Sequence, residues 1–409
     1  MSQNQKRVLI VGGGVAGPVL AYWLGKNDYS VVVLERSKEQ TELGQVIDIE
    51  GPSQEIVSRM GLLHAIRDAS THEEGVTIVD EQGRGIATLP AGQAGGATKE
   101  IEIMRPRLHR LLLGAVKGLG NVEYRFGHTV AGLEKLEGYV RVEVLDIATG
   151  ATKKEDYDIV VACDGFRSRT RDLILPDSKS QACIKSLEVF IAFFEVPTEP
   201  QDRPYSRLYN QPGRRIAVIK PINDTISSAY IGVAKFDQEL HDVRESRDVQ
   251  KQKEAMARRF RGTGWETDRL VDAMFKTENF YFEEISQIKV DTWSDGRCVL
   301  LGDTAWCPSP LTGQGTNTAI LGAYVLADSI IRNGNDVEKA FREYEGNMRP
   351  YVNKIQPIPL GGYAPKLVNP DSAWGIWVQR SLFWCISNSG FSKYLPDNVV
   401  KYEKLPDLY

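Results

Sequence analysis

The fold of this chain is decided near its N-terminus by the run Val8-Leu9-Ile10-Val11-Gly12-Gly13-Gly14-Val15-Ala16-Gly17. The four apolar residues predict a buried strand that starts at about Lys6, the glycines predict a tight turn, and residues 14–26 predict a helix. A second β-rich run, Ser30 to Leu34, follows and ends at Glu35. The three elements together predict a parallel βαβ unit. The chain is therefore expected to be an α/β protein with a Rossmann-like domain.

The glycine-rich turn predicts a dinucleotide-binding site. The first two glycines allow the backbone to approach a pyrophosphate, the last allows close helix packing, and the helix N-terminus presents free amides. Glu35 would accept hydrogen bonds from a ribose, and an acid there favours an unphosphorylated ribose, as in FAD or NAD. For Arg36, a solvated surface charge is an equal alternative to a cofactor contact. The candidate contacts in this unit are Gly12, Gly14, Ala16, Gly17, Glu35 and Arg36.

A second informative run lies far along the chain, at Leu300-Leu301-Gly302-Asp303-Thr304-Ala305-Trp306-Cys307-Pro308-Ser309-Pro310-Leu311-Thr312-Gly313-Gln314-Gly315-Thr316-Asn317. It predicts a strand ending at Asp303, a proline-kinked loop, and a helix from the glycines to about Ile330. The amides and dipole of that helix would stabilise negative charge at its N-terminus. Two such sites suggest one long cofactor laid between them. The candidate contacts here are Asp303, Gly313, Gly315, Thr316 and Asn317.

A third motif, Asp158-Ile159-Val160-Val161-Ala162-Cys163-Asp164-Gly165-Phe166-Arg167, lies between them. The three motifs in this order, over most of residues 6–331, resemble the class A flavoprotein aromatic hydroxylases, the para-hydroxybenzoate hydroxylase-like family. No second G-x-G-x-x-G is present, so a separate nicotinamide domain is not expected. The resemblance therefore implies FAD as the bound cofactor and NADPH or NADH as a reductant that binds only briefly.

The resemblance also implies roles for single residues. Asp303 would bind the ribityl hydroxyls, and the turn at Asp164 would serve both the flavin and the reductant. Arg105 would reach the flavin phosphate and ribityl region, and Asp48 is a possible flavin contact. Arg167, Arg169 and Arg171 could attract the reductant, with a solvated basic face as the alternative. Many relatives carry His where Trp306 stands, so Trp306 is expected to pack the loop and is given no acid/base role.

Residues 180–290 change character and predict an antiparallel sheet that covers the flavin. The β-rich runs are 189–195, 206–209, 215–219, 228–233 and 280–290, with a helix from about Val249 to Phe260. The layout is similar to tetracycline-inactivating and natural-product hydroxylases, which implies substrate contacts at Arg207, Tyr209, Tyr230 and Pro310. Ordinary sheet packing is the alternative for the first three. A polar amide of tetracycline-acting relatives is replaced near Ala192, which puts tetracycline itself in doubt.

The predicted domains are discontinuous. Residues 1–180 and 285–350 form the FAD-binding domain, with an excursion to the substrate side near 70–100, and residues 181–284 form the substrate-binding sheet. Residues 351–409 are expected to be a C-terminal helical segment that bridges both lobes through one face bearing Trp374, Trp377, Phe383, Trp384 and Phe391. A membrane-surface helix is the alternative, although Gln379 and Arg380 interrupt its apolar stretch.

Composition sets the remaining bounds. The 409 residues carry a net charge of -4 with mixed signs, so a nucleic-acid partner is not expected. Five cysteines without a C-x-x-C pair disfavour a disulfide scaffold or zinc site, and the five histidines show no metal-ligand spacing. No apolar run is long enough to span a membrane, and no signal segment precedes the first strand. We expect a cytoplasmic protein, either a monomer or a homodimer, without a metal.

The resemblance implies a single-component flavin monooxygenase. Such an enzyme would use NAD(P)H and O2, through a C4a-hydroperoxyflavin, to hydroxylate, epoxidise or oxidatively rearrange a polycyclic or phenolic molecule. Secondary metabolism or modification of antibiotics and xenobiotics is the expected setting. An oxidase or dehydrogenase of the same fold and a non-enzymatic flavin-binding protein are the alternatives. The sequence assigns no catalytic acid or base.

Overall fold

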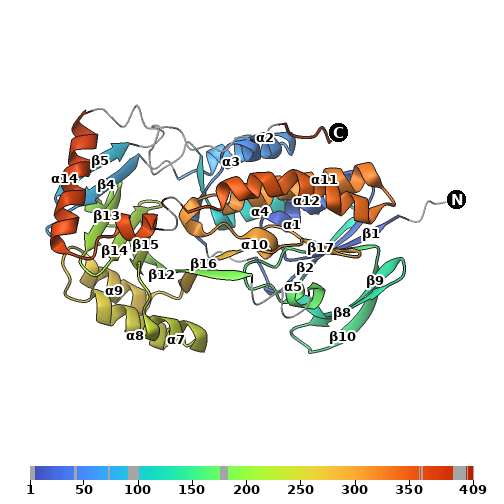
Figure 1. Ribbon diagram of the computed structural model, residues 1–409, viewed down its shortest axis with the longest axis horizontal. Coiled ribbons are helices and arrows are strands. Elements are labelled where there is room, and N and C mark those ends of the chain that lie inside the picture. The colour runs from blue at the N-terminus through green and yellow to red at the C-terminus, as the bar shows by residue number, and fades with distance from the viewer. Residues whose placement is uncertain are drawn as a thin grey trace.

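The computed structural model describes residues 5–40, 44–71, 74–90, 101–175, 183–358, 360, 363–389, 402 and 404–408. Phe391 and one of the five histidines, His72, lie outside these ranges. The described elements form two lobes, a nucleotide lobe around a parallel sheet and a sheet lobe around a larger, mostly antiparallel sheet (Figure 1). The architecture is the predicted α/β fold with an interleaved second sheet and a C-terminal helix.

The nucleotide lobe is built on a six-stranded sheet with the strand order β17-β18-β11-β1-β2-β7. The neighbours from β18 to β7 run parallel. Its strands are β1 (Arg7–Val11), β2 (Ser30–Glu35), β7 (Val122–Phe126), β11 (Ile159–Ala162), β17 (Ser294–Asp295) and β18 (Cys298–Leu300). All four residues of β11 are buried, as expected for a parallel strand covered on both faces.

Helices cover one face of this sheet (Figure 1). They are α1 (Ala16–Lys26), α4 (Arg105–Lys117), α11 (Gly315–Asn333) and α12 (Val337–Ile355). Nearby lie α2 (Pro52–Arg59), α3 (Leu63–Asp68), α5 (Arg169–Ile174), α10 (Asp303–Trp306) and the ribbon of β3 (Val46–Asp48) with β6 (Glu102–Met104). An antiparallel sheet of β8 (His128–Leu136), β9 (Tyr139–Asp146) and β10 (Thr152–Tyr157) lies below, which the sequence analysis did not predict.

The sheet lobe contains seven strands in the order β16-β12-β15-β14-β13-β4-β5. They are β4 (Gly75–Val79), β5 (Gly85–Pro90), β12 (Ile184–Pro197), β13 (Ser206–Gln211), β14 (Arg215–Pro221), β15 (Ile226–Val233) and β16 (Phe280–Ile288). Only the β13–β4 pair is parallel. Helices α7 (Gln238–Ser246), α8 (Val249–Phe260) and α9 (Thr267–Lys276) pack against one face, and short 3-10 turns occur at Pro200–Asp202 and Pro310–Thr312.

The C-terminal region adds α13 (Ala364–Val368) and α14 (Ala373–Ser389). The latter packs against β5 and β13 of the sheet lobe. One prediction about it was wrong: Trp374, Trp377 and Trp384 do not pack against the protein but expose 74%, 65% and 54% of their surface. The physical reason is that the opposite side of the helix, which carries Ile376, is the one that faces the sheet.

The last described residues return to the nucleotide lobe. Leu405 and Leu408 are buried, and the carbonyl oxygen of Pro406 accepts hydrogen bonds from Arg59 and from the Tyr324 hydroxyl, both at 2.7 Å. Tyr324 belongs to α11, so residues 405–408 pack against that helix. All five cysteines are free thiols. Among the helices in the described ranges, none has the length and apolar character that crossing a membrane requires.

Candidate active site

The glycine-rich turn between β1 and α1 has no room for a side chain at Gly12 or at Gly17. A Cβ atom on Gly17 would lie 2.1 Å from the carbonyl oxygen of Gly12, and one on Gly12 would lie 2.3 Å from that of Cys163. Gly12 also has a φ of +115°, which residues with side chains rarely adopt. By contrast, a Cβ on Gly14 would meet only the Arg105 guanidinium, at 3.9 Å. Gly14 is therefore the place where a ligand can approach this backbone.

Glu35, at the end of β2, is held against this turn. Its carboxylate accepts hydrogen bonds from the amides of Gly13 and Ser37, both at 2.8 Å. The Tyr124 hydroxyl donates to the carbonyl oxygen of Gly13 at 2.7 Å. The sequence analysis missed Tyr124, because only the pairing of β7 with β2 brings it beneath the turn. Arg36, the neighbour of Glu35, is exposed.

Arg105 connects the two glycine-rich runs. It is the first residue of α4, with Pro106 at the second position, and its side chain is exposed above Gly14. Its positive charge also acts on Asp303, where it opposes the increase in pKa that burial causes. Arg105 therefore lies near both the expected phosphate site at Gly14 and the expected ribityl site at Asp303.

Asp303 begins α10 and lies beside the N-terminus of α11. Its carboxylate is 3.8 Å from the position of a Cβ on Gly315, and the Cys307 thiol hydrogen-bonds to it. Burial raises the pKa of the Asp303 carboxyl, while Arg105 and the thiol lower it. A buried carboxylate needs hydrogen-bond donors. Hydroxyl groups of a ligand would supply them here.

The N-terminus of α11 is open towards the same place. The side chain of Gln314, at the N-cap, bonds Glu50 and does not cap the helix, so the first amides, from Gly315 and Thr316 onwards, have no side-chain cap. Asn317 is 2% exposed; its Oδ1 accepts a hydrogen bond from the Glu50 amide, but its Nδ2 finds no partner among the described residues. The carboxylate of Asp48 lies 3.7 Å from the position of a Cβ on Gly313. The N-terminus of α11 therefore brings together hydrogen-bond donors, from its first amides and the Asn317 Nδ2, and an acceptor, the Asp48 carboxylate, that a polar ring could use.

The turn after β11 has a more structural role than expected. The Asp164 carboxylate accepts hydrogen bonds from the Ser168 hydroxyl and from the amide and hydroxyl of Thr170, the latter at 2.9 Å. These bonds direct the carboxylate towards α5. The Thr304 hydroxyl accepts from the Gly165 amide at 3.0 Å and thereby joins this turn to the Asp303 run. A cofactor contact of Asp164 stays a prediction.

The three arginines of this turn do not form one solvated face. Arg171 is 2% exposed and donates to the carbonyl oxygens of Phe166 and Thr304, at 3.1 and 3.2 Å. Arg169 is exposed, and Arg167 pairs with a carboxylate of the sheet lobe. Arg171 is buried because it fastens two loops of the nucleotide lobe together, so it is not available to a transient partner.

Trp306 packs the loop that follows Asp303. It is 1% exposed, its ring centroid lies 4.4 Å from that of Trp293, and its edge fills the space above Gly322 of α11. Behind it, Gln287 of β16 donates to the carbonyl oxygens of Pro308 and Gln356, at 3.0 and 2.6 Å. Pro310 is exposed at the start of the 3-10 turn, and its expected substrate contact stays a prediction.

One face of the large sheet carries a row of apolar and aromatic side chains. The row crosses five strands through directly paired residues, namely Leu208, Val218, Tyr230, Phe193 and Tyr281. The ring centroids of Phe193 and Tyr230 are 5.6 Å apart, and those of Phe193 and Tyr281 are 6.4 Å apart. We call this set the aromatic row.

The aromatic row faces the nucleotide lobe. Two residues along β14 from Val218, on the same face, Lys220 forms an ion pair of 3.0 Å with Glu102 of β6. Two residues along β16 from Tyr281, Glu283 pairs with Arg167 of the nucleotide lobe, also at 3.0 Å. Ion pairs to the nucleotide lobe thus flank the row on two strands.

Arg207 and Tyr209 occupy the opposite face. Their paired residues on β14, Ile219 and Ala217, belong to the core that packs against α7, α8 and α9. Arg207 donates to the carbonyl oxygen of Gly83, and the Tyr209 hydroxyl donates to that of Thr263. A one-residue step along a strand reverses the face. Of the three sheet residues proposed for substrate contact, only Tyr230 therefore points towards the nucleotide lobe.

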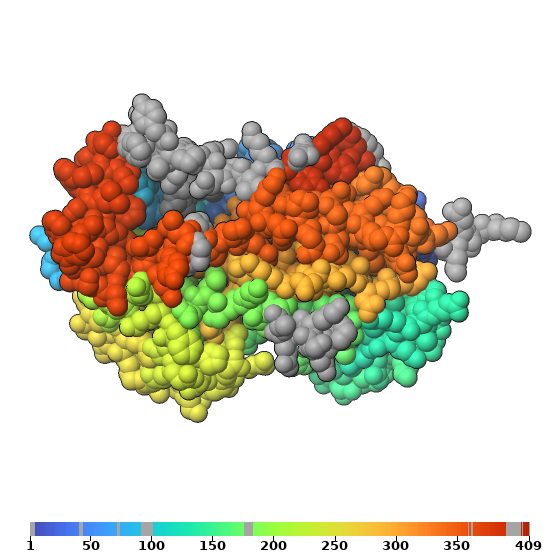
Figure 2. Space-filling view, viewed as in Figure 1, coloured from blue at the N-terminus to red at the C-terminus, as the bar shows by residue number. Residues whose placement is uncertain are grey.

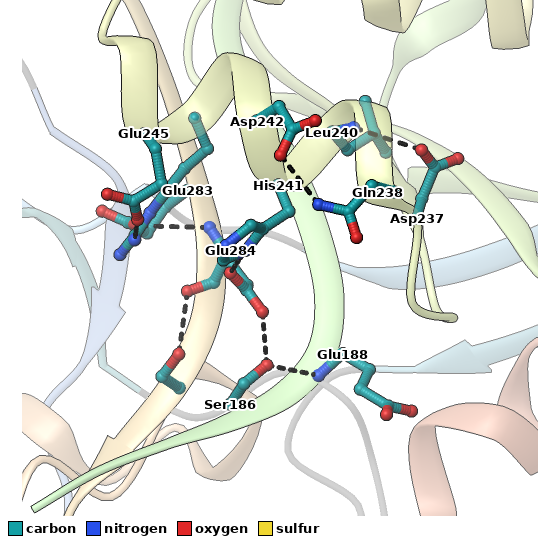
Figure 3. Close-up of polar contacts among 12 residues, drawn as sticks. Ser186, Glu188, Asp237, Gln238, Leu240, His241, Asp242, Glu245, Glu283 and Glu284 are labelled. Atoms are coloured by element: carbon teal, nitrogen blue, oxygen red, sulfur yellow. Dashed lines mark hydrogen bonds and ion pairs between the residues drawn. The ribbon is translucent and has the colours of Figure 1, made fainter. Parts of the chain in front are cut away.

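A polar network surrounds Glu283 at the edge of the sheet (Figure 3). Arg244 of α7 donates to its carboxylate at 2.7 Å, and the Tyr281 hydroxyl donates at 3.1 Å. The adjacent Glu284 faces the other way and bonds His241 at 2.9 Å and the Ser186 hydroxyl. Arg167 therefore joins the turn after β11 to a carboxylate that α7 already holds in place.

The Glu102–Lys220 ion pair predicts a measurable stability effect. Replacing Lys220 by Met leaves the buried carboxylate without its charge partner, which is expected to lower the free energy of unfolding by about 3 kcal/mol in urea denaturation. The double variant Lys220→Met/Glu102→Gln should regain most of this loss. Lys366→Met is the control, because the Lys366–Glu188 pair is more exposed and should contribute less than about 1 kcal/mol. Wild-type stability of Lys220→Met would contradict the prediction.

These features fit a flavin dinucleotide. The open backbone at Gly14 and the Arg105 guanidinium suit phosphates, Glu35 suits a ribose, and the half-buried Asp303 carboxylate suits a polyol. The unpaired Nδ2 of Asn317 suits a polar ring at the α11 N-terminus. In the described part of the chain, no three His, Cys, Asp or Glu side chains gather where they could hold a metal ion. The fold and site together define a flavin-binding α/β protein whose cofactor site is covered by a second sheet.

Comparison with known proteins agrees with this class. The FAD binding domain family matches residues 5–356. Monooxygenase CTB7 of Cercospora beticola is 39% identical over 100% of this chain and 98% of its own length. FAD-dependent monooxygenase asL6 of Sarocladium schorii is 32% identical, with 97% and 96% covered. The crystal structure of tetracycline destructase Tet(55) is similar with a TM-score of 0.78 at 25% identity, over 100% of both chains.

This chain therefore belongs to the FAD binding domain family. It is an FAD-dependent monooxygenase of the class A type. The predicted family, fold and flavin cofactor are confirmed, whereas the individual cofactor and substrate contacts stay predictions.

Proposed function

We propose that this enzyme takes electrons from NADPH or NADH and transfers one atom of O2 to a polycyclic or phenolic small molecule. Hydroxylation, epoxidation and oxidative rearrangement all fit this proposal. The balance is NAD(P)H, a proton, O2 and substrate on one side, and NAD(P)+, water and oxygenated product on the other. The observation that carries the proposal is the aromatic row, which offers a largely aromatic surface on the side of the sheet that faces the flavin-binding lobe.

The residues of the nucleotide lobe would hold the cofactor. We assign the phosphates to the Gly12–Gly17 turn and Arg105, the ribose to Glu35, and the ribityl chain to Asp303. When bound, FAD supplies the chemistry that accepts a hydride and passes electrons to O2. The first-turn amides of α11, including those of Gly315 and Thr316, would stabilise negative charge at the ring.

The sheet lobe has two tasks in this proposal. Tyr230, Phe193 and Tyr281 lie close enough together to form one aromatic surface. The rings of the substrate would pack against this surface, because aromatic rings attract one another in stacked and edge-to-face contacts. The flanking ion pairs of Lys220 and Glu283 hold the sheet against the flavin-binding lobe. A closed apolar site keeps water from the reacting groups.

The similarity to Tet(55), which is named a tetracycline destructase, supports a small organic substrate. The doubt about tetracycline rested on a polar amide of tetracycline-acting relatives that is replaced near Ala192. The structure places Ala192 on the helix-covered face, fully buried and away from the aromatic row, so a replacement at that position is no argument against tetracycline.

The test is a screen of phenolic and polycyclic compounds for stimulated NADPH or NADH oxidation by the flavin-loaded enzyme. Products made under isotopically labelled O2 should contain one labelled oxygen by mass spectrometry. Dehydrogenated product without label would favour the oxidase or dehydrogenase alternative instead. If no compound stimulated NADPH or NADH oxidation and no product formed, the non-enzymatic flavin-binding alternative would be favoured.

Tyr230→Ala is expected to raise KM for the stimulating compound about tenfold, because a stacked ring contributes roughly 1 kcal/mol beyond its buried area. Bound FAD should not change, which absorbance of the purified protein checks. Arg207→Ala, on the opposite face, is the matched comparison and should leave KM within about twofold. If Arg207→Ala raised KM while Tyr230→Ala did not, the substrate would bind the other face of the sheet.

A further inference from the structure

One side of α14 is apolar and exposed. Five of its side chains share that side, with exposures of 74% for Trp374, 65% for Trp377, 39% for Val378, 59% for Leu382 and 54% for Trp384. Residues three, four and seven positions apart lie along one face of a helix. We call this set the α14 arc. A surface this rich in tryptophan is typical of an interface.

Two polar side chains in the middle of α14, Gln379 and Arg380, turn inwards instead. Arg380 donates to the carbonyl oxygens of Val79 and Asn210, both at 3.3 Å, and its guanidinium lies 5.7 Å from the ring centroid of Tyr209. Gln379 donates to the carbonyl oxygen of Val368 at 2.6 Å. The middle of the helix therefore buries its long polar side chains and exposes its tryptophans, unlike an ordinary surface helix. Gln379 and Arg380, which interrupt the apolar stretch in the sequence, do not interrupt the arc.

The preceding helix enlarges the surface. The Gln379 bond holds the end of α13 beside α14, and Tyr363 and Leu367 are 64% and 60% exposed. Figure 2 shows the orange-red atoms of α14 on the surface at the left end of the molecule. The exposed apolar area of α14 and α13 together is on the order of 1,000 Å², compared with about 800 Å² per partner in a stable complex. The surface is therefore large enough for a specific interface.

The charges on this surface favour a second copy over a lipid surface. Between Ala373 and Ser389 the sequence contains no Asp, Glu or Lys, and its one Arg, Arg380, points inwards. Interfacial helices usually combine apolar residues with Lys and Arg that attract anionic lipids, and the arc offers none. Two identical uncharged arcs meet without repulsion.

The arc is also self-complementary. Trp374 and Trp384 are equally distant in sequence from Gln379. In an antiparallel pair with a two-fold axis near Gln379, Trp374 of one copy would therefore lie opposite Trp384 of the other. Closed two-fold dimers bury the same patch on both subunits. We propose that the α14 arc and α13 form a homodimer interface in which α14 packs antiparallel against α14 of a second copy. This proposal does not depend on the substrate or the reductant.

Sedimentation velocity of the flavin-loaded protein from about 1 to 100 µM tests the proposal. The wild type should pass from monomer to dimer in this range, and Trp377→Ser should raise the dissociation constant at least tenfold, as central aromatic residues of interfaces do. Phe236→Ser removes an equally accessible ring, 50% exposed, outside the arc and should change nothing. Bound FAD and the melting temperature show that each variant is folded.

A cross-link gives an independent positive result. Val378 lies next to the proposed axis, so Val378→Cys in a Cys385→Ser background should form a disulfide-linked dimer under mild oxidation. Val249→Cys, which is exposed on α8, should not. Three results would overturn the proposal. The wild type could stay monomeric at 100 µM, or it could form a dimer that Trp377→Ser does not weaken and that the Val378→Cys variant does not cross-link. A monomer that instead binds phosphatidylcholine vesicles would also overturn it.

Discussion

Asp303→Ala is expected to purify largely without FAD, with a dissociation constant for the cofactor raised at least about a hundredfold. The Asp303 carboxylate is half-buried beside the N-terminus of α11, with the Cys307 thiol as one hydrogen-bond donor. Each hydrogen bond to a charged group contributes roughly 1.5–3 kcal/mol, and two ribityl hydroxyls would supply two. The flavin absorbance of the purified protein, and titration of the flavin-free protein with FAD, measure the effect.

Asp303→Asn separates cofactor binding from stability. Burial raises the pKa of Asp303 in the folded protein, so the group favours the folded state at low pH and loses that contribution as the pH rises through the folded pKa. Without FAD, the Asn variant should therefore melt at a higher temperature than the wild type near pH 8, and the difference should shrink towards acid pH. Wild-type FAD content in both variants would refute the ribityl assignment.

Gly17→Ala is expected to abolish the folded nucleotide lobe. The new methyl group would lie 2.1 Å from the carbonyl oxygen of Gly12, and both atoms belong to backbone that β1 and α1 hold in place. Such an overlap requires the helix to move away from the strand, at a cost above about 4 kcal/mol, which is a large part of the stability of most domains. Soluble yield, circular dichroism and the melting temperature show the loss.

Gly14→Ala is the matched control in the same turn. Its methyl group would meet only the mobile end of Arg105, at 3.9 Å, so the protein should fold with a melting temperature within a few degrees of the wild type. FAD binding should nevertheless weaken, because the methyl group enters the space where the phosphates approach. If Gly17→Ala folded normally, or if Gly14→Ala kept full FAD affinity, the turn would not bind the cofactor as proposed.

The elements of the proposed cofactor site were largely predictable because their motifs are local. A strand, a tight turn and a helix N-terminus lie within ten residues of Gly12, and their chemistry follows from backbone geometry. The same holds for Asp303 and the start of α11. Tyr124 and the Asn317–Glu50 bond were missed, because they depend on which strands and helices become neighbours.

The sheet lobe was harder to predict in detail. Its strands were recognised from their β-rich runs, but the face of each residue depends on register. Arg207 and Tyr209 lie one residue either side of Leu208, and this single step places them against α7–α9 while Leu208 joins the aromatic row. The exposed tryptophans of α14 were misassigned for a similar reason, since helical spacing identifies a face but does not show which side the sheet covers.

The sequence by itself determined the α/β class and the elements proposed to bind a dinucleotide, because these follow from short-range patterns of glycine, acid and β-branched residues, and its family resemblance implied the flavin. Only the tertiary structure decided which side chains face the proposed substrate surface. Glu102 and Lys220, or Arg167 and Glu283, are more than a hundred residues apart, and their pairing exists only after both lobes have folded against each other. Contacts of that separation leave no periodic signal in a single sequence.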